Sequence, residues 1–272
     1  MNYLESAIDF NDKRVVDAYD ELPLWSAPFG LMLLDRIPMK PEMSVLDVGC
    51  GTGFPLLELA GRLGPSSRLV GIDTWSAALE RARAKAKAYG LENVRIVEGD
   101  AARMAFDDGS FDLVTSNLGI NNFEDPDAVL RQCFRVLRTP GTLALTSNCV
   151  GHMREFYDHL SRALPKEARP ALERHIAHRS TPEAIAARME KAGFKIAEVA
   201  TDSFRMRFAN GKALFTHSFI RLGFLPAWKE IVPEKDRARV FQALEAAMPG
   251  EIALTIPCVC IVGRKQASPP PS

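Results

Sequence analysis

The fold is decided by the stretch Val45-Leu46-Asp47-Val48-Gly49-Cys50-Gly51-Thr52-Gly53-Phe54-Pro55, which joins an apolar strand to a helix through three glycines at alternate positions. Glycine lets the backbone turn sharply and lets a ligand approach amide groups that a Cβ atom would shield. The helix that follows offers unpaired N–H groups and the positive end of its dipole, and Pro55 suits its first turn. The stretch therefore predicts a junction that binds a small anionic or zwitterionic ligand.

The spacing of the glycines argues against two common nucleotide motifs. A dinucleotide fingerprint needs G-x-G-x-x-G, but the last glycine of that pattern is replaced by Phe54 in one frame and by Leu56 in the other. No Lys followed by Ser or Thr comes after the glycines, which excludes a phosphate-binding P-loop. For the glycines alone, a plain tight turn without a ligand remains an alternative.

Downstream of the glycines, predicted strands and helices alternate. Strands are expected at 44–48, 68–72, 94–98, 111–116 and 142–147, and helices at 54–63, 76–89 and 126–138. This alternation predicts a mostly parallel sheet with helices on both faces, and a ligand beyond the carboxyl ends of the strands. Thr139-Pro140-Gly141 suits a type II turn. Two more strands are expected near 195–201 and 254–263.

The chain is predicted to form one domain over residues 1–265 with helical additions. Residues 1–40 have helical periodicity broken by prolines and are expected to form an N-terminal lid. Residues 151–179 and 203–250 read as helical insertions that cap the substrate. The tail, 266–272, is rich in proline and is expected to be disordered.

The composition is that of an ordinary globular protein of 272 residues. Its 34 basic and 34 acidic residues cancel, so no overall field attracts a polyanion or an anionic membrane. No apolar run is long enough to span a bilayer, and the first residues lack a basic and then apolar signal segment. Five cysteines without a C-x-x-C pair argue against a disulfide framework and a zinc site. We therefore expect a cytoplasmic protein without a metal.

With Asp47 ahead of the glycines, the run resembles the first motif of class I S-adenosylmethionine-dependent methyltransferases. The segment Phe111 to Ser147 is similar to the small-molecule branch, particularly to quinone-biosynthesis C-methyltransferases. The resemblance implies a Rossmann-like seven-stranded α/β fold, S-adenosylmethionine as cofactor and S-adenosylhomocysteine as product. In that family the last strand lies inside the sheet, antiparallel to its neighbours. Because Pro257 cannot donate a ladder hydrogen bond, we expect the regular strand to begin after it, or a bulge there.

The resemblance also implies a set of cofactor-binding residues. Asp73 would accept the ribose hydroxyls, Asp100 would receive the adenine amino group, and Asp47 would hold the methionine end, although the first two could instead be ordinary helix caps. Trp75 could also be a core residue. The full predicted set is Tyr19, Asp47, Gly49, Cys50, Gly51, Gly53, Asp73, Thr74, Trp75, Asp100, Ala101, Asn117 and Leu118.

His152 is the candidate catalytic residue. It follows the predicted strand 142–147, near the edge where an acceptor is expected, and a general base is needed only if the acceptor must lose a proton. The alternative is a solvent-exposed histidine at a helix start. His175 and His178 are expected at the surface. Several aromatic residues could line an apolar acceptor pocket or simply form core: Trp25, Phe29, Phe204, Phe208, Phe215 and Phe219.

The leading functional hypothesis is methylation of a small, aromatic or lipophilic acceptor. The alternatives are an RNA or protein methyltransferase, and a module that binds S-adenosylmethionine without catalysis. The basic residues of 81–87 spread around a helix, which favours a solvated face over RNA binding. No Asn/Asp-Pro-Pro-Tyr/Phe tetrapeptide follows the strand 111–116, which speaks against methylation of base or glutamine amide nitrogens. The sequence leaves open which atom receives the methyl group and the oligomeric state.

Overall fold

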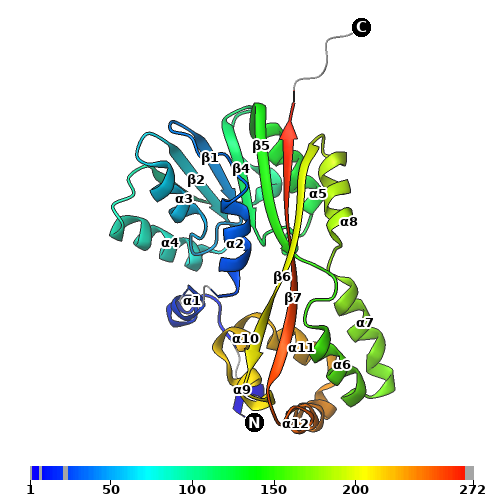
Figure 1. Cartoon of the computed structure of the whole chain (residues 1–272). Coiled ribbons are helices and arrows are strands. Elements are labelled where there is room, and N and C mark those ends of the chain that lie inside the picture. The colour runs from blue at the N-terminus through cyan, green and yellow to red at the C-terminus, as the bar shows by residue number, and fades with distance from the viewer. Residues whose placement is uncertain (1, 6–7, 21–23, 267–272) are drawn as a thin grey trace. The chain divides into compact units, whose positions relative to one another are not determined.

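The computed structural model describes residues 2–5, 8–20 and 24–266, so the predicted disordered tail, apart from Gln266, lies outside the described residues. Within this part of the chain, seven strands form one sheet in the order β3-β2-β1-β4-β5-β7-β6 (Figure 1). The strands are β1 Ser44–Val48, β2 Arg68–Asp73, β3 Val94–Glu98, β4 Phe111–Asn117, β5 Leu137–Asn148, β6 Lys195–Phe208 and β7 Ile252–Lys265. The predicted fold class, a mostly parallel seven-stranded α/β sheet, is confirmed.

The strand order places a switch point beside β1. The chain moves outward from β1 to β2 and β3, and then returns to form β4 on the other side of β1. All pairings among these strands are parallel, with Asp47 of β1 opposite Thr115 of β4 and Gly71 of β2. In open α/β sheets, ligands bind beyond the carboxyl ends of the strands at such a point. The three glycines follow β1 there.

Helices connect the parallel strands, as predicted. The helices α3 and α4 pack on β2 and β3, whereas α5 packs against α8 (Figure 1). The starts of α5 and α8 are capped by side chains, because Asp125 accepts from the Ala128 amide at 2.8 Å and Thr181 from the Ala184 amide at 3.2 Å. The helices of this group are α2 Ser26–Leu34, α3 Leu56–Leu63, α4 Ser76–Ala88, α5 Pro126–Val136 and α8 Pro182–Lys191.

The strands β5 and β6 are each at least six residues longer than predicted. The strand β6 continues to Phe208, so residues 203–208 are strand and not the start of a helical insertion. Their sequence alternates, since Phe204, Met206 and Phe208 are less exposed than the residues between them. This period of two is a strand signal. The strand β5 begins at Leu137 and runs through 139–141, where a type II turn was expected.

The last strand does not begin after Pro257, which was the first of the two expectations for this residue. The second, a bulge at Pro257, stays a prediction. The strand β7 begins at Ile252 and passes through Pro257. A proline lacks the N–H donor but keeps its carbonyl, and the Pro257 carbonyl accepts from the Cys149 amide at 3.0 Å. Two residues earlier, the Thr255 carbonyl accepts from the Met153 amide at 2.8 Å. One missing donor therefore does not end the strand. The position of β7 inside the sheet, between β5 and β6, agrees with the family pattern.

The contacts divide the chain into two compact units. The sheet unit comprises Pro23–Ser147, Thr181–Thr201 and Cys258–Ser272. The helical unit comprises Met1–Leu22, Asn148–Ser180 and Asp202–Pro257. The strands β6 and β7 each belong in part to both units. The predicted insertion 151–179 lies entirely in the helical unit, and so does 203–250.

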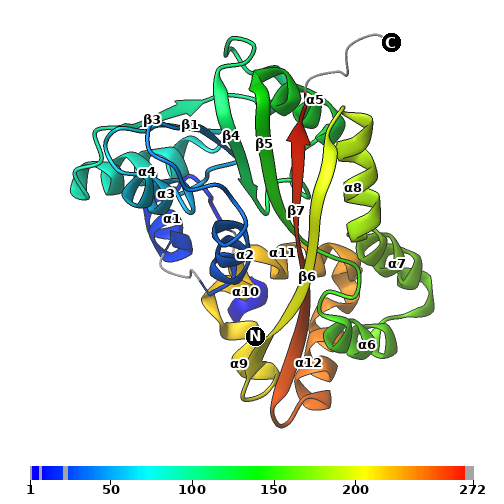
Figure 2. The same ribbon diagram turned by 45° about the horizontal axis from the view of Figure 1, so that its top comes forward.

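The helical unit has an aromatic core of its own. Trp228 and Phe156 are fully buried and stack with ring centroids 3.9 Å apart, and Phe215 packs edge-on against both. Tyr3 stacks on Phe215 at 5.4 Å, so the described part of the N-terminal segment joins this core. In Figure 2, α9 and α12 lie beside the lower ends of β6 and β7. The helices of the unit are α1 Lys13–Asp20, α6 Arg154–Ala163, α7 Arg169–Ala177, α9 Gly211–Thr216, α10 Ser218–Gly223, α11 Leu225–Ile231 and α12 Arg237–Ala247.

Candidate functional site

The glycine junction has the backbone that the sequence predicts. Gly49, Gly51 and Gly53 all have positive φ angles, of 74°, 49° and 103°. Such angles are strained for any residue with a Cβ atom. The Gly49 amide donates to the Ile72 carbonyl at 2.8 Å, which ties the junction to the end of β2. A Cβ atom added to Gly51 would meet nothing within 4 Å. Gly51 therefore borders open space.

Asp47 is a buried carboxylate at the end of β1. It is 1% exposed, and its Oδ1 accepts a hydrogen bond from the Thr115 hydroxyl at 2.7 Å. Among the described residues, its Oδ2 has no hydrogen-bond partner of normal geometry, although the nearby Leu56 amide lowers the pKa. Burial, reinforced by the charge of Asp73, raises the pKa of Asp47 to about 7. A ligand with an ammonium group would supply the missing charge partner.

Asp73 ends β2 and links the glycine junction to α4. Its Oδ2 accepts from the Gly51 amide at 2.8 Å, and its Oδ1 accepts from the Trp75 amide at 2.9 Å. A carboxylate offers about four acceptor positions, so both oxygens can still accept from ligand hydroxyls. The bond to the Trp75 amide forms a turn before α4 and is not a helix cap, because Trp75 itself is the N-cap residue of α4 and that helix has no side-chain cap hydrogen bond. The ribose contact of Asp73 stays a prediction. Trp75 is half-buried and Thr74 is exposed.

Asp100 follows β3, at the same edge of the sheet. Its Oδ1 accepts from the Ala102 amide at 2.8 Å and so caps a short 3-10 helix, Ala101–Arg103. The carboxylate is exposed and retains acceptor positions, whereas Ala101 is buried. Asp100 is therefore a cap, and its predicted contact with adenine stays a prediction.

Asn117 and Leu118 lie at the carboxyl end of β4. The Thr146 hydroxyl donates to Asn117 Oδ1 at 2.7 Å and accepts from the Leu118 amide at 3.2 Å. Leu118 has a left-handed φ of 66°. A branched or bulky residue rarely adopts this angle, and such strain often marks a functional turn. Both residues are half-buried and accessible to a ligand at this edge.

Sequence reasoning missed residues that shape this site. Thr115 holds Asp47, but only the register between β1 and β4 brings them together. Phe123 covers the other side of the junction, 3.6 Å from where a Gly49 Cβ atom would stand. Cys50 was expected to contribute mainly backbone. Its side chain is buried, and this burial raises the pKa of the thiol, so it is not a nucleophile.

Two predicted site residues, Tyr19 and His152, belong to the helical unit. Tyr19 lies on α1, with its ring 6.3 Å from that of Phe219, and its contact with the cofactor stays a prediction. The expectation that His152 might be a solvent-exposed helix-start residue is wrong, because it is 3% exposed. Its ring lies 5.4 Å from that of Phe224. Burial, together with the charges of Arg179 and His175, lowers the pKa of His152 to about 3, so His152 is neutral near pH 7.

The histidine pair on α7 also differs from the expectation. His175 is half-buried and its Nε2 lies 2.9 Å from the Tyr157 hydroxyl, so it is not an ordinary surface residue. His178 is exposed, as expected. Among the aromatic residues proposed as pocket lining, Phe29 and Phe215 have no exposed surface and are core residues of different units. Long-range packing decides these positions, and no local sequence pattern reports it.

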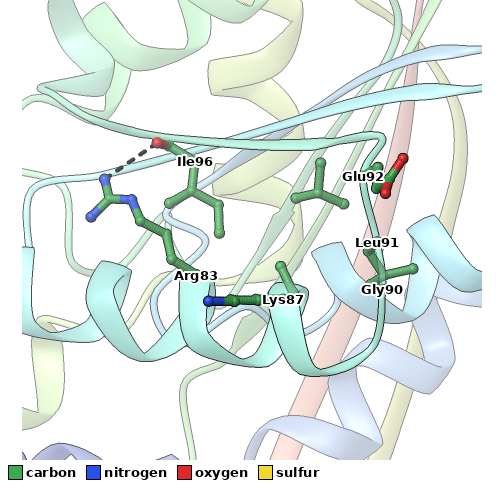
Figure 3. Close-up of a pocket in the computed structure, with 8 residues that line it drawn as sticks. Arg83, Lys87, Gly90, Leu91, Glu92 and Ile96 are labelled. Carbon is green, nitrogen blue, oxygen red and sulfur yellow. Dashed lines mark hydrogen bonds between the residues drawn. The ribbon is translucent and has the colours of Figure 1, made fainter.

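A pocket of about 470 Å³ lies elsewhere on the sheet unit (Figure 3). It is formed by the end of α4 and the start of β3, at the opposite edge from the glycine junction. Arg83 and Lys87 border it, and Arg83 donates to the Ile96 carbonyl at 3.3 Å. Both basic side chains are exposed, whereas Arg81 and Lys85 are half-buried, so the solvated face predicted for 81–87 holds for two of its four basic residues. The pocket contains none of the predicted site residues.

Two absences bear on the chemistry. In the described part of the chain, no group of three or more His, Cys, Asp or Glu side chains is placed to hold a metal ion. Among the same residues, no helix combines the length and the apolar character that crossing a membrane requires.

Comparison with known proteins decides the family. A model of the family described as "Methyltransferase domain" matches residues 39–202, more than half of the chain. The chain is also 30% identical over 271 residues to the nocamycin O-methyltransferase of Saccharothrix syringae, with 92% of this chain and 96% of that protein covered. This chain belongs to the methyltransferase family. The glycine junction and the strand order make it a class I methyltransferase, with S-adenosylmethionine as its cofactor.

Two further comparisons place this methyltransferase among its relatives. It is 33% identical over 133 residues to the demethylmenaquinone methyltransferase of Lactococcus lactis, and spans about half of that protein, 51%. Its fold resembles that of the Haemonchus contortus phosphoethanolamine N-methyltransferase 2 in complex with S-adenosyl-L-methionine. The TM-score is 0.59 at 18% identity, over 97% of this chain and 61% of that one. At that identity, the likeness shows the fold alone.

Proposed function

We propose that this methyltransferase transfers the methyl group of S-adenosylmethionine to a small acceptor with an aromatic or lipophilic body. The relative that it matches over nearly its whole length is named for a small molecule, nocamycin, and a second is named for demethylmenaquinone. The observation that carries the proposal is the buried Asp47 Oδ2, which has no hydrogen-bond partner among the described residues and lies four residues before the open space at Gly51. A zwitterionic nucleoside fits this arrangement, because it needs both a close approach to backbone amides and an anionic partner.

We assign the residues of the sheet unit to parts of the cofactor. Asp47 would hold the ammonium group, the glycines would admit the ligand to the backbone, and Asp73 would accept the ribose hydroxyls. Asp100 and Ala101 would face the adenine. The remaining members of the proposed set are Gly49, Cys50, Gly53, Thr74, Trp75, Asn117, Leu118 and, from the helical unit, Tyr19. When bound, S-adenosylmethionine supplies a sulfonium-activated methyl group for in-line displacement.

The chain's own task in this reaction is to position the acceptor and to exclude water. A base is needed only if the acceptor must lose a proton. We propose His152 as a residue that contacts the acceptor. Because it is neutral near pH 7, it could accept a hydrogen bond, but its low pKa makes it a weak base.

A cytoplasmic location and an acceptor other than nucleic acid complete the proposal. The five cysteines are all free and buried, which is typical of a reducing compartment. The balanced net charge offers no field for RNA. Two alternatives remain: a protein or RNA methyltransferase, and a module that binds the cofactor without catalysis. An acceptor panel distinguishes both of them from the proposed function.

Calorimetric titration with S-adenosylmethionine and S-adenosylhomocysteine tests the cofactor site, with NAD as the control ligand. We expect both sulfur nucleosides to bind and NAD not to bind. Asp73→Ala should abolish binding, and Asp73→Asn, which can still accept from one amide, should weaken it less. Binding of NAD, or undiminished binding by a folded Asp73→Ala variant, would contradict the proposal. Methyl transfer from labelled cofactor to small phenols and quinols, with tRNA and a peptide mixture as comparison, then tests the acceptor class.

A further inference from the structure

The middle of α2 contains a glycine against which the end of the glycine junction packs. Gly30 is buried in the interior of this helix, where glycine is a poor helix former. A Cβ atom added to Gly30 would lie 2.2 Å from Cε1 and 2.4 Å from Cζ of Phe54. Phe54 directly follows Gly53, the last glycine of the junction. The Phe54 ring therefore occupies the space that a larger side chain at position 30 would need.

The glycines of the junction have close neighbours at both ends. A Cβ atom added to Gly53 would lie 3.3 Å from the Cβ atom of Ala82, which belongs to α4. At the other end, Gly49 faces the ring of Phe123 in the loop after β4. Of the three junction glycines, Gly51 alone has nothing within 4 Å of an added Cβ atom. Packing therefore restricts the two ends of the junction and leaves its middle open.

The helix α2 is attached to the rest of the sheet unit near both of its ends. At its start, the Ser26 carbonyl accepts a hydrogen bond from Nδ2 of Asn117, at the carboxyl end of β4, at 3.3 Å. Just after its end, Nε of Arg36 lies 3.0 Å from Oε1 of Glu198 in β6. Between these points α2 packs beside β4 (Figure 1). A side chain added at position 30 would therefore have to displace the Phe54 ring rather than the helix.

We propose that Gly30 is a positioning residue of the cofactor site, which admits the Phe54 ring and so fixes the end of the glycine junction. Gly30 is itself buried and acts through Phe54. A side chain at position 30 would displace the ring and, with it, the backbone that follows Gly53. A ligand held by closely approaching amides tolerates little displacement of those amides. This inference rests on the proposed function, since it concerns the site proposed for S-adenosylmethionine.

Gly30→Ala and Gly61→Ala form a matched pair of variants of the full chain. Both glycines lie inside helices, but a Cβ atom added to Gly61 of α3 would meet nothing within 4 Å. Gly30→Ala should weaken the calorimetric affinity for S-adenosylmethionine about fivefold or more. Gly61→Ala should leave this affinity unchanged and raise the urea midpoint of unfolding, because alanine is the better helix former.

Phe54→Ala distinguishes positioning from a loss of stability. This variant removes the ring that links the junction to α2, so it should weaken the affinity for S-adenosylmethionine about threefold or more. Gly30→Ala added to Phe54→Ala should then change the affinity by less than about twofold, because the added methyl group no longer meets a ring. A residue that only stabilises the fold would lower the urea midpoint and leave the affinity of the folded protein unchanged. Circular dichroism at the titration temperature identifies the folded variants.

Titration of the parent chain separates this inference from the proposed function. If the parent binds S-adenosylmethionine and a folded Gly30→Ala binds it equally well, the inference fails and the proposed function stands. The inference also fails if Gly30→Ala weakens binding as much in the Phe54→Ala background as in the parent. If Gly30→Ala does not fold, unchanged affinity in Phe54→Ala alone overturns the inference. If the parent chain does not bind the cofactor, the proposed function fails and the inference fails with it.

Discussion

The glycine junction of the sheet unit and the cluster of Tyr157, His175 and Trp228 in the helical unit are built in opposite ways. The junction consists of backbone conformation, with three positive φ angles within five residues and side chains that cap neighbouring amides. The cluster consists of side chains from separate segments, with Tyr157, His175 and Trp228 joined by hydrogen bonds across up to 71 residues. The junction is therefore encoded locally, whereas the cluster depends on tertiary packing. Substitutions should affect the two in different ways.

The largest effect is expected from Asp47→Asn, measured as the pH dependence of unfolding. The pKa of Asp47 is raised to about 7 from 3.8 by burial, so between these values the native state holds a proton that the unfolded state has lost. The free energy of unfolding should therefore fall as pH rises from about 4 to 7, by a few kcal/mol, and stay level above. Asp47→Asn should remove this slope.

Thr115→Val sharpens the same prediction. The Thr115 hydroxyl stabilises the ionised carboxylate of Asp47, so its loss should raise the pKa of Asp47 and extend the slope to higher pH. Urea unfolding at a series of pH values gives both results. A slope in Asp47→Asn equal to that of the parent would show that another group carries the titration.

Gly51→Ala and Gly90→Ala form the second test. Both glycines have positive φ angles, of 49° and 66°, and at both positions a Cβ atom would meet nothing within 4 Å. The backbone strain should therefore be similar, about 1 kcal/mol in the free energy of unfolding. Only Gly51 borders the proposed ligand, so Gly51→Ala should weaken S-adenosylmethionine binding about tenfold or more, and Gly90→Ala should not. Equal affinities of the two variants for S-adenosylmethionine would contradict a ligand site at the glycine junction.

The smallest effect is expected from Tyr157→Phe. It removes the hydrogen bonds to His175 and Trp228 and should lower the free energy of unfolding by about 1 kcal/mol. Tyr89→Phe is the control, because Tyr89 is 65% exposed and should change stability little. Cofactor affinity should be unchanged in both variants. A loss of cofactor binding in Tyr157→Phe would show that the glycine junction depends on the Tyr157 hydrogen bonds, which we do not expect.

The parallel half of the fold could be predicted because its signals are local. The strands at 44–48 and 94–98 were predicted to the residue, since short apolar runs are bounded there by turn residues and helices. The full lengths of the longer strands β5 and β6 were not predicted. The alternation of Phe204, Met206 and Phe208 was a readable strand signal that we interpreted as helical core. Pro257 was given too much weight, because a proline removes one donor and leaves an acceptor.

The candidate site residues show the same difference between local and long-range signals. The positions of the glycines, Asp47 and Asp73 at strand ends and turns could be predicted from local patterns, and their contacts with the cofactor stay predictions. The burial of His152 and the bond between Tyr157 and His175 depend on contacts between different segments. The periodicity of a single sequence carries no signal for contacts between residues on different segments.

The path of β6 and β7 has a consequence for engineering. Because the chain enters and leaves each unit several times, and passes through β6 and β7 without a break, neither unit corresponds to one continuous gene segment. A cut at 201 or 257 would sever a strand. Exchange of the helical unit with that of a relative would therefore need several simultaneous junctions, and changes of acceptor preference are more accessible through point substitutions than through recombination of whole modules.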